Sequence, residues 1–280
     1  MTSPLSPAWS GLVDDAAVFP PGNAPLPDAV SAHRERRDEW WADLVGSFVV
    51  TDEKLSGVGD PLPLSVVVTG GAGAVPGALR IAGRAGHTVA GLEIALRDLD
   101  DLAGNARRVA AAVDAAAVEG LLDDEVPTYV ELPAVPDAGS WLRAADAVAE
   151  SGLRLKFRTG GLEAHLFPSA TTLAGWVDAA LDRETPFKCT AGLHHALAHT
   201  DDATGFAHHG FLNVLVATLR AFDGAATDEV VALLEARDPE PLLTTGDDLA
   251  RGRRWFTSFG SCSVTEPLDD LLALGLLEKP

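Results

Sequence analysis

Short apolar, β-branched segments alternate with longer Ala- and Leu-rich segments along most of this chain. The strand-like segments lie at 11–18, 46–52, 63–69, 88–96, 127–134, 153–159, 186–192 and 254–263. Helical patterns lie at 26–45, 73–86, 98–122, 138–151, 169–184, 208–221, 226–236 and 265–276. Strands separated by helices favour parallel pairing with right-handed crossovers. Eight of them in 280 residues predict an α/β fold, a (β/α)8 TIM-type barrel forming a single domain over residues 1–280.

The link between the second and third strands departs from this pattern. Residues 51–63 are too few and too rich in Gly and Pro for a full crossover helix, so we expect a degenerate second helix. An open, doubly wound sheet is the alternative architecture. No GxGxxG motif opens the first βα unit, which favours the barrel.

The charge of the chain limits its partners. Lys and Arg number 21 against 41 Asp and Glu, giving a net charge of −20 that opposes binding to nucleic acid or an anionic membrane surface. Two cysteines do not suggest a disulfide framework. The first residues resemble no secretory signal, and the most apolar run, PLPLSVVVTGG, is too short to span a bilayer. We therefore expect a cytoplasmic protein without nucleic-acid or membrane partners.

Four strands place a charged residue on the face that points into the barrel. Side chains alternate between the two faces of a strand, so Glu93, Glu131, Lys156 and Lys188 are predicted to enter one lumen. An unpaired buried charge costs several kcal/mol, so such residues are usually paired, neutralised or functional. The cluster predicts either a structural layer of ion pairs or an active site with these four residues as catalytic groups.

Two neighbouring lysines suggest imine chemistry. A lysine is nucleophilic only when unprotonated, and a second ammonium nearby lowers its pKa. We expect Lys156 to be the nucleophile and Lys188 the neighbour that lowers its pKa, because Arg158 adds positive charge beside Lys156 while Thr190 follows Lys188. Glu131 would relay protons, provided that it is partly neutral or acts through water.

The segments LKFRTGG and FKCTAGLHH resemble the two lysine motifs of class I aldolases of the deoxyribose-phosphate aldolase type. Those enzymes are barrels with a Schiff-base lysine on the sixth strand and a second lysine on the seventh. The resemblance covers two strands, and it implies these roles for Lys156 and Lys188. The family uses an aspartate as its proton-shuttling acid, for which this chain offers Glu131 or Glu93. Its phosphate-binding glycine pair follows the second lysine, whereas Gly160 and Gly161 follow the first.

Further polar residues lie where the strands end. Glycine-rich turns expose backbone N–H groups that can hold an anion, and Arg158 stands beside one such turn. Histidines cluster at 194–209, and a helix there would place His195 and His199 at zinc-ligand spacing. The last strand ends in FTSFGSCS, without a signature of thiol or hydroxyl catalysis. The predicted substrate-binding residues are Arg158, Gly160, Gly161, Thr190, His194, His195 and Asp15.

The sequence thus predicts a cofactor-independent, aldolase-like lyase that acts on a small carbonyl compound through a lysine Schiff base. One alternative is a metal-dependent barrel hydrolase or isomerase, with ligands from Asp14, Asp15, Glu93, Glu131, His194 and His195. Another is a barrel that binds a small anion without catalysis. The amphipathic segment 266–277 is expected to close the barrel, and a homo-oligomer interface is a second use for it.

Overall fold

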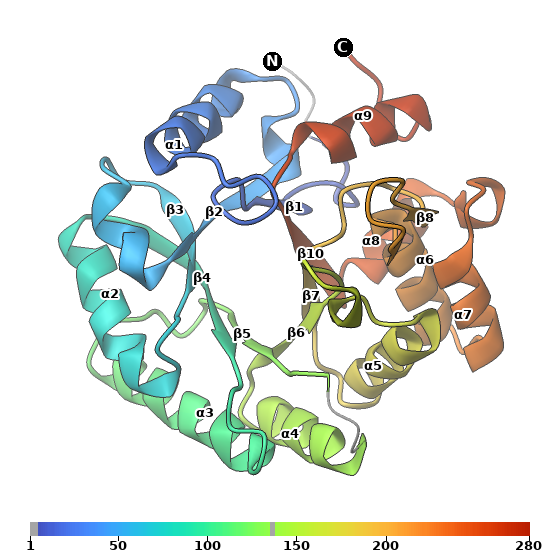
Figure 1. The fold of residues 1–280 in the computed structure, drawn as a ribbon. Helices are drawn as coiled ribbons and strands as arrows, with labels where there is room; N and C mark the ends of the chain where they lie inside the picture. The colour runs from blue at the N-terminus through green and yellow to red at the C-terminus, as the bar shows by residue number, and fades with distance from the viewer. Residues whose placement is uncertain (1–4, 135–137) are drawn as a thin grey trace.

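The computed structural model describes residues 5–134 and 138–280, which form a closed barrel of parallel strands with helices around it (Figure 1). The order around the barrel is β1-β10-β7-β6-β5-β4-β3-β2. The strands are β1 (Val13–Asp15), β2 (Val45–Thr51), β3 (Pro63–Val67), β4 (Thr88–Ala95), β5 (Thr128–Glu131), β6 (Arg154–Arg158), β7 (Phe187–Thr190) and β10 (Phe256–Ser261). Each lies inside a predicted strand segment, except that β2 begins one residue earlier, at Val45, and the predicted (β/α)8 TIM-type barrel is confirmed.

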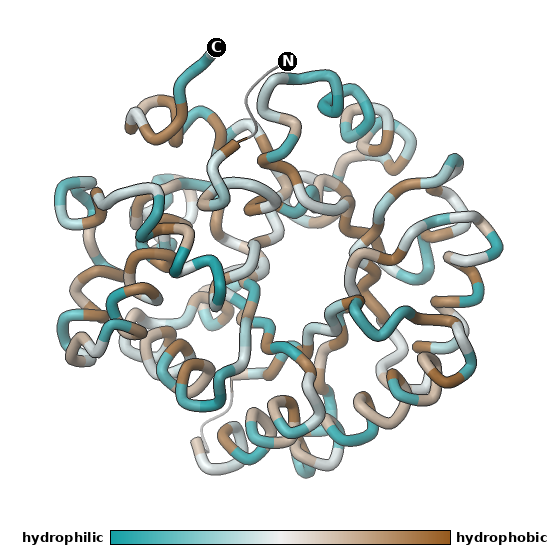
Figure 2. The backbone as a smooth tube through the Cα atoms, turned by 180° about the vertical axis from the view of Figure 1, so that it is seen from behind, coloured by the Kyte–Doolittle hydropathy of each residue, from teal (hydrophilic) through white to brown (hydrophobic). Residues whose placement is uncertain are grey.

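The helices surround the strands with their apolar sides inward. They are α1 (Leu26–Glu35), α2 (Val75–Arg84), α3 (Leu102–Val118), α4 (Ala138–Glu150), α5 (Ala170–Asp182), α6 (Phe211–Phe222), α7 (Thr227–Glu235), α8 (Gly246–Gly252) and α9 (Thr265–Ala273). Seen from behind, the peripheral helices alternate between apolar and polar stretches (Figure 2). This is the pattern of helices that bury one face against a sheet.

The connection between β2 and β3 is the short one that the sequence predicts. It holds only the 3-10 helix η3 (Asp52–Gly57), so the second helix of the barrel is degenerate. The remaining 3-10 turns are η1 (Arg36–Asp38), η2 (Ala42–Leu44), η4 (Ala72–Ala74), η5 (Ala164–Leu166) and η6 (Glu240–Leu242).

Two predictions of local structure are wrong. The helix predicted over 26–45 ends at Glu35, because Arg36 turns inward to bond Asp15 and Trp41 is buried against the barrel. The helix predicted from 208 begins at Phe211, after an antiparallel hairpin of β8 (His199–Thr200) and β9 (Ala207–His208). Tertiary contacts override local propensity in both places.

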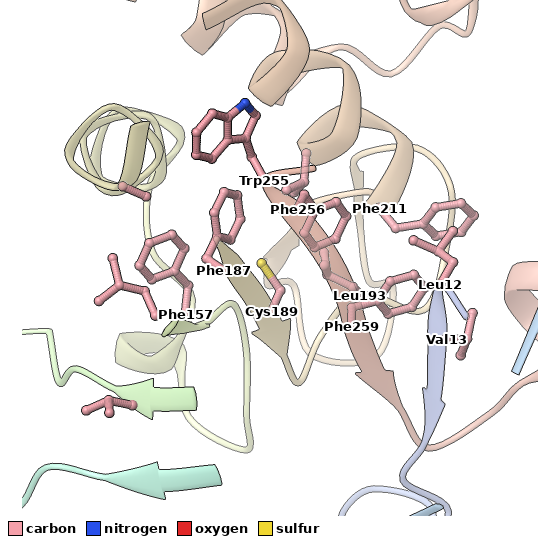
Figure 3. Packing of buried hydrophobic residues seen from close by; sticks show 14 of the residues in the cluster. Leu12, Val13, Phe157, Phe187, Cys189, Leu193, Phe211, Trp255, Phe256 and Phe259 are labelled. Atoms are coloured by element: carbon pink, nitrogen blue, oxygen red, sulfur yellow. The ribbon is translucent and has the colours of Figure 1, made fainter. Parts of the chain in front are cut away.

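The core between strands and helices is aromatic on the side of β6, β7 and β10 (Figure 3). The ring centroids of Phe157 and Phe187 lie 4.7 Å apart, those of Phe187 and Phe256 5.6 Å apart, and those of Phe211 and Phe259 5.1 Å apart. Cys189 is buried in the same layer. Since these residues point outward to the helices, their neighbours along each strand point into the lumen.

Candidate active site

The sixth and seventh strands bring the two lysines side by side. Lys156 on β6 and Lys188 on β7 are direct partners in the parallel ladder, and Glu131 on β5 is the partner of Lys156. Glu93 enters from β4. All four side chains are buried, so the predicted convergence of charge in one lumen is what the structure contains.

Glu93 bridges the two ammonium groups. Its Oε1 accepts a hydrogen bond from Lys188 Nζ at 2.6 Å, and its Oε2 lies 2.7 Å from Lys156 Nζ. One carboxylate therefore offers a separate oxygen to each lysine. Charge-assisted hydrogen bonds of this length are the strong ones in proteins.

Ion pairs extend this bridge in both directions. Glu131 Oε2 lies 3.0 Å from Lys156 Nζ, and Glu131 Oε1 accepts from Arg158 Nε at 2.7 Å. On the other side, Lys188 Nζ donates to Asp14 Oδ2 at 2.7 Å. Three carboxylates, Asp14, Glu93 and Glu131, thus alternate with three cations, Lys188, Lys156 and Arg158. Full ionisation leaves no net charge on these six residues, which limits the cost of burial.

Asp14 also accepts bonds from hydroxyl groups on two other strands. Ser258 Oγ donates to its Oδ2 at 2.7 Å, and Ser47 donates to its Oδ1 from both the hydroxyl and the backbone N–H. Ser47 Oγ in turn lies 2.6 Å from the hydroxyl of Ser65. Strands β2, β7 and β10 thus each supply Asp14 with a partner, and the carboxylate is fixed in position. The sequence offered Asp14 as a possible base or metal ligand, and the serines were not singled out as its partners.

Asp15 lies on the opposite side of β1 from Asp14. Its Oδ2 is 3.0 Å from His33 Nδ1 and accepts from Arg36 Nη1 at 2.6 Å, both on the helical side of the strand. Its Oδ1 accepts from the backbone N–H of Ala17. Strand alternation therefore separates Asp15, predicted to bind substrate, from the lysine cluster.

The charge states follow from the pairing. Burial opposes ionisation of Glu93, but the two lysines outweigh it and lower the pKa of Glu93 to about 2. Burial likewise opposes ionisation of Glu131, yet Lys156 and Arg158 lower its pKa. Burial disfavours both charged lysines, but the carboxylates beside them raise the pKa of Lys156 and of Lys188.

The expectation that Lys156 rests with a lowered pKa is therefore wrong. Lys188 does act to lower the pKa of Lys156, but Glu131 and Glu93 act more strongly in the opposite direction. Arg158 is paired with Glu131 rather than left to add positive charge beside Lys156. The further condition was that Glu131 is partly neutral or reaches Lys156 through water. The first is wrong for the same reason, and Glu131 Oε2 lies 3.0 Å from Lys156 Nζ, in direct contact. In the resting protein, Lys156 is an ammonium.

We expect acid to weaken the fold through Glu93. Its folded-state pKa of about 2 lies below the value of 4.5 that the carboxyl group has in the unfolded chain, so the stabilisation by Glu93 is complete above pH 4.5 and is lost as the pH falls toward 2. The loss is about 3 kcal/mol of unfolding free energy, and Glu131 acts in the same direction. Urea unfolding at several pH values should show this loss in the wild type and much less of it in Glu93→Gln. Equal acid sensitivity of the two proteins would contradict the prediction.

The glycines after β6 pack against the loop after β7. A Cβ at Gly160 would lie 2.8 Å from the Cα of Gly192, and Gly192 itself has a φ of +79°. Gly161 faces Leu166 in the same way. Thr159 ties the two loops together by donating from its backbone N–H to the carbonyl of Thr190. Close backbone approach accounts for Gly160, and the side chain of Leu166 leaves no room for a Cβ at Gly161. The predicted role of Gly160, Gly161 and Thr190 in binding substrate stays a prediction.

The histidines after β7 lie around the rim rather than on a helix. His194 Nδ1 is 2.8 Å from Glu266 Oε2, and His195 Nδ1 is 3.2 Å from Asp270 Oδ2, so both contact α9. The residues from 193 to 198 form no helix, which removes the predicted i, i+4 zinc spacing. His195 also lines a cavity of about 570 Å³ with His199, Arg237 and Asp270, and none of the six charged lumen residues borders that cavity.

No family model and no curated protein matches this chain. Within residues 5–134 and 138–280, no group of three or more His, Cys, Asp or Glu side chains is arranged to hold a metal ion. No helix in the same ranges has both the length and the apolar character needed to cross a membrane. Conclusions about activity therefore depend on the lumen geometry itself.

Proposed function

We propose that this protein is a cofactor-independent lyase that cleaves or forms a carbon–carbon bond in a small carbonyl compound through a lysine imine. The observation that carries the proposal is the bridge by Glu93, which contacts both lysines with one oxygen each. Imine chemistry needs an amine and a group that takes and returns its protons within hydrogen-bond reach. Lys156 and Glu93 meet this requirement in a buried, desolvated lumen.

Lys156 is the better nucleophile of the two because its surroundings open toward solvent. Its partner Glu131 is bonded to Arg158, whose side chain is 40% exposed. Lys188, in contrast, is 1% exposed and is held by Asp14 and Glu93 together. Lys188 also lies 5.2 Å from the centre of the Tyr129 ring, a contact that favours its charged form. Lys188 is thus suited to remain charged beside the reacting amine.

The proton of Lys156 has two acceptors at hydrogen-bond distance, Glu93 Oε2 and Glu131 Oε2. Transfer to either one leaves a neutral amine beside a neutral carboxylic acid, so no net charge is created in the lumen. The amine nitrogen then adds to the carbonyl carbon, and one of its protons passes to the carbonyl oxygen to give a hydroxyl group. The protonated carboxyl group returns its proton to that hydroxyl, which leaves as water, and the product is a protonated imine. Lys188 and Arg158 keep the other carboxylates ionised during this exchange.

The resemblance to class I aldolases supports the same assignment. That family places its Schiff-base lysine on the sixth barrel strand and the second lysine on the seventh, as Lys156 and Lys188 are placed here. Its acid is an aspartate, and the carboxylate between the lysines of this chain is Glu93. We therefore propose that the substrate is a small carbonyl compound and that the reaction needs no cofactor.

Borohydride trapping tests the proposal directly. The wild-type protein is incubated with a panel of small aldehydes and ketones, phosphorylated and not, then reduced, and the adducts are located by peptide mass spectrometry. We expect one adduct, on Lys156, at a higher occupancy than on the exposed Lys54 and Lys279, which serve as internal controls for non-specific labelling.

Occupancy of Lys156 no greater than that of Lys54 across the panel would contradict the proposal. Two further measurements then distinguish the alternatives. A stoichiometric metal in protein purified without chelator would favour the metal-dependent hydrolase or isomerase. Thermal stabilisation by a small anion without turnover would favour a binding barrel.

A further inference from the structure

A second group of reactive side chains lies at the rim of the barrel, outside the ion-pair network. Cys262 directly follows β10, at the C-terminal ends of the strands, where barrels of this type carry their reactive groups. It is partly buried. The loop after β1 packs against it, since a Cβ added to Gly22 would lie 3.0 Å from the Cβ of Cys262. The thiol is thus held in place but not sealed inside the protein.

His194 stands beside this thiol. Its Nε2 lies 3.7 Å from Cys262 Sγ, within the range of a hydrogen bond to sulfur. Its Nδ1 lies 2.8 Å from Glu266 Oε2. The sulfur lies slightly closer to Nε2 than to Nδ1, at 3.7 Å against 4.0 Å, and Nδ1 is also 3.4 Å from Ser261 Oγ, so the imidazole stands between the thiol and the carboxylate. Cys262 and Glu266 come from the short link between β10 and the first turn of α9, and His194 comes from the loop after β7.

This order of groups is the one that activates a nucleophile. The thiolate, not the thiol, attacks, so a base within reach of the sulfur is required. A carboxylate on the other ring nitrogen fixes the orientation of the imidazole and stabilises its charged form. Burial of His194 opposes that charge, but its bonds to Cys262 and Glu266 prevail and raise its pKa. His208 also faces His194, and a positive charge on either imidazole disfavours one on the other.

We propose that Cys262, His194 and Glu266 form a second nucleophilic site, which takes small aldehydes as reversible hemithioacetals. His194 Nε2 accepts the thiol proton, and the sulfur adds to the carbonyl carbon as the C=O electron pair moves to oxygen. The imidazolium then gives its proton to that oxygen. One C–S bond forms, one C=O π bond becomes a C–O–H group, and no oxidant, reductant or leaving group is needed.

This site does not depend on the lysine assignment. Its three side chains make none of the contacts of the lumen network, and sulfur addition needs no imine. The two sites are also chemically separable, because borohydride reduces an imine but not a hemithioacetal. Both sites would bind carbonyl compounds, so an aldehyde bound to Cys262 would lie at the rim of the barrel that contains Lys156.

The test measures the alkylation of Cys262 by iodoacetamide from pH 5 to 9, followed by peptide mass spectrometry. We expect Cys262 at pH 6 to react about tenfold faster than the same cysteine in urea-unfolded protein, because His194 Nε2 lies within reach of the thiol proton in the folded protein only. Cys189 is the internal control: it is buried, burial raises its pKa, and it should not react in the native protein. Acetaldehyde should slow alkylation of Cys262, and equally so in Lys156→Ala.

Variants separate activation from mere exposure. His194→Ala and His194→Gln should both remove the rate advantage at pH 6, and Glu266→Gln should reduce it, while all react normally at pH 9. His199→Ala is the matched control from the same loop, because His199 has no recorded contact with Cys262, and it should leave the rate unchanged. A native rate at pH 6 equal to the unfolded rate, or one unaffected by both His194 variants, would overturn the site. Activation without protection by acetaldehyde would overturn the aldehyde as its ligand.

Discussion

Replacing Lys156 by alanine is expected to abolish both turnover and borohydride trapping, because the other amine in the lumen, Lys188, is 1% exposed and is held by Asp14 and Glu93 together. Lys156→Arg tests the same point with the charge retained. A guanidinium still pairs with Glu93 and Glu131 but does not lose its proton to form an imine. Circular dichroism and urea unfolding show whether each variant is folded. Loss of trapping in a folded Lys156→Arg protein identifies the nucleophile and not merely a structural ion pair.

Lys188→Ala is the informative comparison. Lys188 acts to lower the pKa of Lys156, so its removal should raise that pKa further and leave a slow enzyme. The activity of this variant should recover as the pH rises, since base then removes the proton that Glu93 no longer takes readily. A pH–rate profile measures this. An active Lys156→Ala protein, or an adduct found on Lys188 alone, would show that the two roles are assigned the wrong way round.

Removal of the Glu93 carboxylate is expected to cause the largest loss of stability of any single substitution in the lumen. Glu93→Ala leaves Lys156 and Lys188 buried with one shared partner fewer, and Asp14 and Glu131 can neutralise them only from the outer ends of the network. Breaking a buried ion pair in this way costs about 3–5 kcal/mol. The free energy of unfolding in urea should fall by that amount at neutral pH.

The matched control for Glu93→Ala is Glu119→Ala. Glu119 Oε2 lies 2.6 Å from Arg80 Nη2, as close as any pair in the lumen, but the side chains of Glu119 and Arg80 are 51% and 47% exposed. An exposed pair of this kind is worth about 1 kcal/mol or less. Similar losses in the two variants would mean that water reaches Glu93 freely and that the lumen is not a desolvated site. In that case the low pKa of Glu93 would lose its physical basis.

The fold was largely predictable from sequence periodicity. Each strand of this barrel is flanked by a helix or a short turn, so its apolar run and the helical pattern that follows are local features. The short Gly- and Pro-containing link after Thr51 predicted the degenerate helix for the same reason. The prediction failed where local propensity met tertiary contacts, as at Arg36, which bonds Asp15 and ends the first helix early. The prediction of the rim after β7 failed for the same reason, because long-range contacts determine its conformation.

The sequence by itself also placed four of the six charged network residues in the lumen, since strand parity puts Glu93, Glu131, Lys156 and Lys188 on one face. Only the tertiary structure decided how these charges pair. Closure of the barrel brings Asp14 to Lys188 across 174 positions of sequence, and it gives Glu93 to both lysines. Ion pairing reverses the expected direction of the shift in the Lys156 pKa, because the electrostatic field at a buried ammonium depends on the nearest opposite charges in space. Parity within one strand contains no information about those distances.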